Sequence, residues 1–125
     1  MTPHLLVDWD NLRRRAIQML PNAYAPYSNY QVGAAALVDD GRIIVGCNVE
    51  NRSYGVTLCA ECGLVSALHA SGGGRLVAFT CVNGSEEVIT PCGRCRALLH
   101  EHGGPEMLVE TDEGVMTLGE LYPRP

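Results

Sequence analysis

The sequence contains no lysine, so its nine basic residues are all arginines, and the formal net charge is −5. Proteins whose affinity comes from neutralising many phosphates need clustered lysine and arginine side chains. The one dense basic run, at residues 13–15, falls in a segment with amphipathic helical spacing, where such a run is typical of a solvated helix face. The composition therefore argues against a nucleic-acid partner.

Long apolar runs are missing as well, since no stretch approaches the roughly 18 to 20 residues that span a bilayer. The first residues, MTPHLLVDWDN, lack the basic start and the long apolar core of a secretory signal. With 46% apolar and 18% charged residues, the composition is that of a globular protein. We expect a cytoplasmic protein that makes no membrane contact.

The chain length also limits the number of domains. A length of 125 residues is enough to bury one core and too short for two domains of ordinary size. No internal repeat, linker or low-complexity segment divides the sequence. We therefore expect one domain over residues 1–125.

Apolar periodicity and turn residues predict alternating helices and strands. In sequence order we expect a helix from Trp9 to Leu20 capped by Asp8, strands at 32–38 and 42–49, a helix at 60–70, a strand at 76–82, a helix after Pro91, a strand at 106–110, and a short helix capped by Thr117 and Glu120. The turn at 39–41 makes the first two strands an antiparallel hairpin, and the later alternation implies parallel crossovers. The prediction is an α/β fold, a three-layer α/β/α sandwich with a mixed sheet of roughly five strands.

Four of the six cysteines form two Cys-x-x-Cys pairs, Cys59 with Cys62 and Cys92 with Cys95. In a chain without a secretion signal, such cysteines are more typical of metal ligands than of disulfides. All four sulfurs could close a structural zinc site in a non-catalytic module, or three could hold an open, catalytic site. Each pair stands at a predicted helix start, where amide groups and the helix dipole stabilise thiolate. Because Cys62 would reach a shared ion only if its helix start were distorted, we favour Cys59, Cys92 and Cys95.

Glu61 distinguishes these two interpretations. A carboxylate two residues after a metal thiolate, in the first turn of the same helix, can point beside the ion without binding it. A water molecule at an open zinc position would then have a proton acceptor next to it, which is the arrangement of a hydrolytic site. In the closed alternative, Glu61 is an exposed carboxylate favoured by the helix dipole.

Several motifs resemble a known family. Cys59-Ala60-Glu61 followed by Pro91-Cys92-x-x-Cys95 is similar to the pattern of zinc-dependent nucleobase deaminases. Within that superfamily, further segments resemble the small tetrameric cytidine deaminases. These segments are Pro26-Tyr27-Ser28 with Val32-Gly33-Ala34-Ala35, and then Gly46-Cys47-Asn48-Val49-Glu50-Asn51. The resemblance runs from about Ala23 to Pro123, and two linked metal motifs plus a substrate motif are more specific than any one of them.

The resemblance implies a hydrolase that deaminates cytidine and deoxycytidine to uridine and deoxyuridine with release of ammonia, in pyrimidine salvage. A zinc-activated hydroxide would attack C4, with one Zn²⁺ per subunit held by three cysteines and Glu61 as the proton shuttle. The resemblance also gives roles to other residues: substrate contacts at Tyr30, Asn48, Val49, Glu50 and Ala60, hydrogen-bond donors near the thiolates at Arg94 and Arg96, and a contact across the subunit interface of a homotetramer at Tyr54. Another cytosine-containing small molecule, such as a nucleoside antibiotic, is the alternative substrate.

The sequence departs from the family pattern at three places. Cys62 stands where relatives often carry an arginine that balances the thiolate charge, which directs attention to Arg94 and Arg96. Tyr30 stands where relatives usually carry phenylalanine against the pyrimidine. The chain reaches Pro125 without the C-terminal aromatic residue that many relatives insert into a neighbouring site, and Tyr122 is the candidate substitute.

Overall fold

The computed structural model describes residues 7–124 and contains a mixed sheet of six strands. The strands are β1 (Val32–Val38), β2 (Ile43–Cys47), β3 (Leu76–Asn83), β4 (Val88–Ile89), β5 (Leu108–Thr111) and β6 (Gly114–Thr117). Their order is β2-β1-β3-β5-β6, and β4 pairs with the end of β3. β3 and β5 are parallel and the other pairs are antiparallel. The predicted mixed sheet is therefore confirmed, with six strands in place of five.

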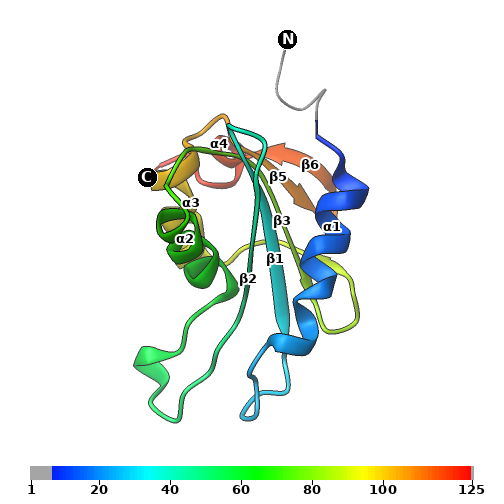
Figure 1. Cartoon of the computed structure of the whole chain (residues 1–125), viewed down its shortest axis with the longest axis vertical. Coiled ribbons are helices and arrows are strands. Elements are labelled where there is room, and N and C mark those ends of the chain that lie inside the picture. The colour runs from blue at the N-terminus through cyan, green and yellow to red at the C-terminus, as the bar shows by residue number, and fades with distance from the viewer. Residues whose placement is uncertain (1–6, 125) are drawn as a thin grey trace.

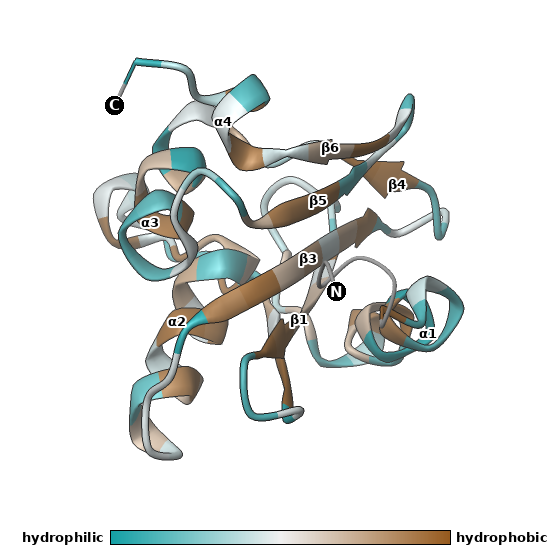
Figure 2. Ribbon diagram, turned by 90° about the horizontal axis from the view of Figure 1, so that it is seen from above, coloured by the Kyte–Doolittle hydropathy of each residue, from teal (hydrophilic) through white to brown (hydrophobic). Residues whose placement is uncertain are grey.

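Helices cover both faces of the sheet and produce the predicted three layers (Figure 2). α1 (Trp9–Gln18) lies on one face, while α2 (Ala60–Ala70) and α3 (Gly93–Gly103) lie on the other. The chain also forms the short helix α4 (Leu118–Leu121) and the 3₁₀ turns η2 (Leu20–Asn22) and η3 (Tyr54–Val56). None of the helices within residues 7–124 is long and apolar enough to cross a bilayer. Residues 1–6 lie outside the described residues. They are the first part of the N-terminal stretch that was compared above with a secretory signal.

Strand β1 separates two hydrophobic cores. Ala34, Ala36 and Val38 belong to the core beneath α2, whereas Ala35 belongs to the core beneath α1. Since both faces of this strand are covered, its sequence is apolar throughout rather than alternating. The small alanine side chains let helices approach the sheet closely from both sides.

The helix caps follow the sequence predictions. The Asp8 carboxylate accepts a hydrogen bond from the backbone N–H of Asn11 at 3.1 Å, so α1 begins where it was expected. At the other end of the chain, Thr117 and Glu120 form the predicted capping box of α4.

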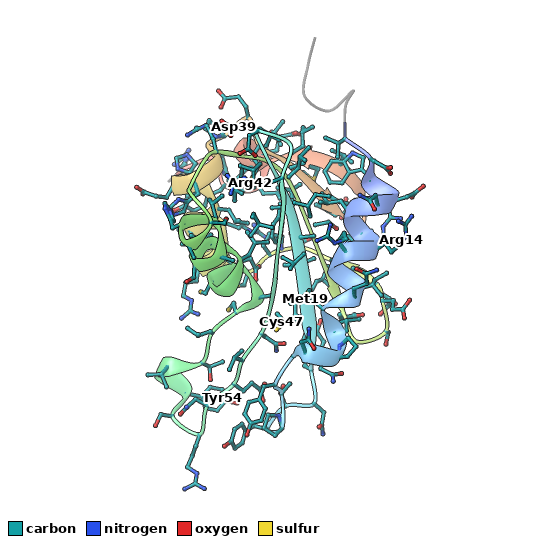
Figure 3. The ribbon with its side chains drawn as sticks, in the orientation of Figure 1. Arg14, Met19, Asp39, Arg42, Cys47 and Tyr54 are labelled. Atoms are coloured by element: carbon teal, nitrogen blue, oxygen red, sulfur yellow. The ribbon has the colours of Figure 1, made fainter. Side chains whose placement is uncertain are left out.

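The arginine run of α1 is only partly a solvated face. Arg14 is exposed and points away from the sheet (Figure 3). Arg13 instead donates to the carboxylate of Glu110, which also accepts from the Thr80 hydroxyl at 2.8 Å. Glu110 is buried on β5, so Arg13 ties α1 to the sheet. This pairing could not be seen from the sequence because the partners are 97 residues apart.

Several element boundaries differ from the predictions: α1 ends at Gln18 rather than at Leu20, and β5 is Leu108–Thr111 rather than 106–110. β2 ends at Cys47 rather than at residue 49, because Val49 leaves the sheet and forms isolated bridges with Tyr24 and Leu58. β6 was not predicted, because it has only four residues and exposes Val115 at the edge of the sheet. Its pairing with β5 supplies the stabilisation that its own sequence pattern does not indicate.

Gly46 lets the start of α2 approach β2. A Cβ atom added at Gly46 would lie 2.7 Å from the backbone nitrogen of Leu64 and would also collide with the carbonyl oxygen of Ala60. Gly46→Ala is therefore expected to lower the free energy of unfolding by about 1 to 3 kcal/mol or more, as for other overpacked sites. Urea unfolding measures the change.

Gly63→Ala is the matched control, because it adds the same methyl group to the helix that packs on Gly46. Its Cβ would lie 3.7 Å from the carbonyl oxygen of Cys47, which is an ordinary contact. Alanine is favoured over glycine inside a helix by about 0.8 to 1.0 kcal/mol, so this variant should be as stable as the parent or more stable. If Gly46→Ala had the parental stability, the start of α2 would have to move away from β2 without any cost in the free energy of unfolding.

Candidate active site

The starts of α2 and α3 bring three cysteine sulfurs together. Cys59 is the N-cap of α2, Cys92 is the N-cap of α3, and Cys95 lies in the first turn of α3. Their Sγ atoms all lie within 4.8 Å of one another. A tetrahedral zinc ion with Zn–S bonds of about 2.3 Å needs sulfurs about 3.8 Å apart, so this donor set fits zinc.

Cys62 is not part of this cluster in the described residues. It follows Cys59 by most of a helical turn, and α2 is regular from Ala60 onward. The undistorted helix start therefore carries the Cys62 sulfur away from the position shared by the other three. The closed four-sulfur alternative does not match this geometry.

The three thiols differ in how readily they ionise. Burial raises the pKa of Cys59 and, more strongly, the pKa of Cys95. Burial also opposes ionisation of Cys92, but hydrogen bonds from the backbone N–H groups of Arg94 and Cys95 and from the Cys95 thiol together lower its pKa. Three such thiols do not ionise together without a cation between them, and a bound divalent ion deprotonates its thiol ligands.

Glu61 lies beside the cluster and outside it. The residue sits in the first turn of α2, only 4% exposed, and it lines the cavity together with Cys59 and Cys92. Burial is the main cause that raises the pKa of its carboxyl group. A buried carboxyl group with a raised pKa can both accept and return a proton, which is what general acid–base catalysis requires.

A cavity of about 340 Å³ opens onto the cysteine cluster and Glu61. Three of the five predicted substrate residues line it: Tyr30, Asn48 and Ala60. The other two, Val49 and Glu50, are not among its lining residues. The remaining wall comes from Val32, Thr57, Leu58, Cys81, Ile89, Thr90 and Pro91. Most of these were not singled out from the sequence, because they lie on loops and strand ends without a motif.

Asn48 holds the loop at the cavity mouth. Its Oδ1 atom accepts from the backbone N–H of Val32 at 2.9 Å, and its Nδ2 atom donates to the carbonyl oxygen of Tyr30 at 2.8 Å. An amide side chain can make four hydrogen bonds, so one N–H and one lone pair remain for a ligand.

Glu50 fixes the neighbouring loop that carries the Pro26-Tyr27-Ser28 motif. Its carboxylate accepts from the backbone N–H groups of Tyr27 at 2.9 Å and Ser28 at 3.2 Å, and also from the Ser28 hydroxyl. The hydroxyl is the largest cause that lowers the pKa of Glu50. Two motifs about 20 residues apart in the sequence therefore form one hydrogen-bonded unit beside the cavity.

Residues 8–111 match the family model described as the cytidine and deoxycytidylate deaminase zinc-binding region. The chain belongs to this family. A cytidine deaminase of Mycobacterium tuberculosis is 59% identical over 117 residues, which cover 94% of this chain and 88% of that protein. The match covers both halves of the cysteine cluster, and it confirms the zinc-binding deaminase assignment made from the motifs.

Solved structures of cytidine deaminases agree with this assignment. The crystal structure from Mycobacterium leprae has a TM-score of 0.93 and 57% identity, covering 94% of this chain and 99% of that one. The structure from Burkholderia pseudomallei has a TM-score of 0.81 and 38% identity, covering 98% of each chain.

Within this deaminase fold, Arg94 contacts the cluster and Arg96 supports it indirectly. The Nη2 atom of Arg94 donates to the Cys59 sulfur at 3.5 Å. Arg96 was predicted near the thiolates, but its two hydrogen bonds reach the carbonyl oxygens of Pro91 at 2.8 Å and Leu121 at 2.9 Å. It therefore fixes the peptide that leads into Cys92 and ties α3 to the end of α4.

Tyr54 and Tyr122 lie far apart. Tyr54 is 84% exposed on η3, in the loop that projects beyond the end of the sheet (Figures 1 and 3). Tyr122 packs against the deaminase core, with its ring centroid 5.6 Å from that of His100 on α3. Tyr122 therefore does not cover the cavity of its own chain.

Proposed function

We propose that this protein catalyses the hydrolytic deamination of cytidine and deoxycytidine to uridine and deoxyuridine, with release of ammonia, in pyrimidine salvage. The observation that carries the proposal is a buried carboxylate, Glu61, facing a cavity beside a three-sulfur cluster that lacks a fourth protein ligand among the described residues. Family membership and relatives named cytidine deaminase support the same reaction.

Cys59, Cys92 and Cys95 would hold the zinc ion. When bound, zinc supplies a Lewis acid that lowers the pKa of a coordinated water to about 7, far below that of bulk water. Three thiolates give the ion more negative charge than imidazoles would, and Arg94 lies where it can offset part of that charge at Cys59. Arg94 would take over the role of the arginine that relatives often carry at position 62, where this chain has Cys62.

Glu61 carries the protons of the reaction. It accepts the proton that the attacking water loses and passes it to N3 of the cytosine ring as oxygen bonds to C4. It then takes the remaining proton from that oxygen and delivers it to the exocyclic amine, which leaves as ammonia. Because burial raises the pKa of its carboxyl group, Glu61 can hold the proton between the two transfers.

The cavity suits an uncharged nucleoside better than a nucleotide. Asn48 retains hydrogen-bonding capacity for a ribose hydroxyl, and Ala60, which also lines the cavity, would contact the base. Glu50 and Val49 would act on the sugar through the loops that they hold. Among the described residues that line the cavity, Glu61 is the only carboxylate, and none is a lysine or arginine. A nucleotide phosphate would therefore enter without a cationic partner.

An absorbance assay with the purified protein tests both parts of the proposal. Cytidine and deoxycytidine should be converted, and a zinc chelator should abolish the conversion. Deoxycytidylate should show a kcat/KM lower by about 10² or more, because its phosphate stays unpaired. Equal turnover of deoxycytidylate would overturn the nucleoside assignment, and failure to deaminate any of the three would overturn the reaction.

We also propose that the protein assembles into a homo-oligomer, a tetramer by family resemblance, in which Tyr54 reaches a neighbouring subunit. Support comes from exposed apolar side chains between residues 24 and 58, two of which, Tyr30 and Leu58, line the cavity: Tyr24, Tyr27, Tyr30, Val49, Tyr54, Val56 and Leu58. Such a concentration is typical of a protein interface. Sedimentation should give about four times the chain mass of 13.5 kDa. An active monomer would contradict the assembly.

We propose that residues 1–125 act as one deaminase domain in the cytoplasm, on a free pyrimidine nucleoside, without a nucleic-acid or membrane partner. All six cysteines lie in the described part of the chain and carry no disulfide bond there. Free thiols, three of them suited to a metal, are typical of a reducing compartment.

A further inference from the structure

The C-terminal ends of α2 and α3 bring two histidines into contact. His69 lies in the last turn of α2 and His102 in the last turn of α3. The Nε2 atom of His69 is 3.4 Å from the Nδ1 atom of His102, and the ring centroids are 5.0 Å apart at an interplanar angle of 72°. Because both helices begin at the cysteine cluster and rise about 1.5 Å per residue, the pair lies about 15 Å from that cluster.

The geometry of this pair matches that of two ligands on one metal ion. Imidazole nitrogen is a preferred ligand of zinc, nickel and copper ions. Two nitrogens bound tetrahedrally at about 2.0 to 2.1 Å lie about 3.3 to 3.4 Å apart. The observed separation therefore needs little rearrangement to admit an ion, and each helix end already restricts one of the two side chains.

The surroundings of the pair favour a cation. The two helices end side by side, so the negative ends of both helix dipoles point to the region of His69 and His102. Just beyond α3, the guanidinium of Arg75 and the carboxylate of Glu106 both lie near Gly104, so their charges offset each other there. His69 is exposed and His102 half-buried, so an ion and its water ligands can reach the facing nitrogens.

We propose that His69 and His102 form a second metal site, separate from the three cysteines, that binds late first-row divalent ions such as Zn²⁺ and Ni²⁺. No third cysteine, histidine or carboxylate of the described residues joins the pair, so water completes the coordination. A chelate of two neutral imidazoles binds more weakly than three thiolates. The site therefore exchanges its ion while the cysteine site keeps its zinc.

Calorimetric titration of the zinc-loaded protein with Ni²⁺ at slightly alkaline pH tests this site. The parent protein should bind one additional Ni²⁺ per chain without releasing zinc. His69→Gln and His102→Gln each remove one ligand, so each should weaken Ni²⁺ binding by about tenfold or more. Loss of a ligand should lower the metal affinity at least as much as loss of a residue that only supports a ligand.

His100→Gln is the matched control, since it removes a half-buried histidine from the same turn of α3 that packs on Tyr122 and not on His69. It should bind Ni²⁺ as the parent does. Zinc content and cytidine turnover, measured on every variant, should stay at the parental level and so report that the fold is intact. The proposal would be overturned if His69→Gln and His102→Gln kept the parental Ni²⁺ affinity, or if His100→Gln lost as much affinity as they do. This test does not depend on whether the protein deaminates cytidine.

Discussion

Glu61→Gln is expected to lower the turnover of cytidine by a factor of about 10² to 10⁴ while the protein keeps its zinc. That factor corresponds to about 3 to 5 kcal/mol of activation free energy, the usual contribution of a general acid–base group. Glutamine has nearly the same shape as glutamate and fits the same buried position. It cannot accept a proton, so the transfers to the ring and to the leaving amine lose their carrier.

The measurement pairs steady-state kinetics with zinc analysis of the same preparation. Turnover should fall much more than the affinity for substrate, because the role proposed for Glu61 concerns protons that move only during the reaction. Glu101→Gln, which neutralises an exposed carboxylate on α3, controls for the change in net charge and should leave turnover unchanged. Near-parental turnover by zinc-loaded Glu61→Gln would remove this residue from the mechanism.

The cysteine cluster could be predicted from the sequence because its physics is local. Each Cys-x-x-Cys pair marks a helix start, which places candidate sulfur ligands there without knowledge of the rest of the fold. In the folded protein the two helix starts pack together, and this brings Cys59, Cys92 and Cys95 within reach of one ion. Capping residues were equally predictable, because Asp8 and Thr117 act within one turn of themselves.

The cavity walls could not be predicted in the same way. Thr57, Leu58, Ile89 and Thr90 lie on loops or strand ends, where neither helical nor strand periodicity applies. Their place in the site depends on long-range pairing, such as the bridge between Val49 and Leu58. Family resemblance did point to Asn48 and Glu50, but not to the loop contacts that these two side chains make.

Cys92→Ala should remove zinc from the protein and with it all measurable deamination. Two remaining sulfurs do not hold the ion against a chelator, and without it no hydroxide forms at neutral pH. The same change should lower stability and solubility, because the ion joins the starts of α2 and α3 and its binding energy contributes to folding. Zinc content, thermal unfolding and turnover measure the three effects together. Full activity in a zinc-free Cys92→Ala protein would contradict the metal mechanism.

Cys62→Ala provides the comparison that separates three-sulfur from four-sulfur coordination. Cys62 has the same chemistry as Cys92 and lies in the same region, yet its sulfur is outside the cluster. Cys62→Ala should therefore keep one zinc and most of its activity, and X-ray absorption of the parent should count three sulfur ligands. If Cys62→Ala lost its zinc, or the parent showed four sulfurs, the ion would have no open position for water. Glu61 would then have no proton to accept, because the reaction depends on one coordination site that the protein leaves free.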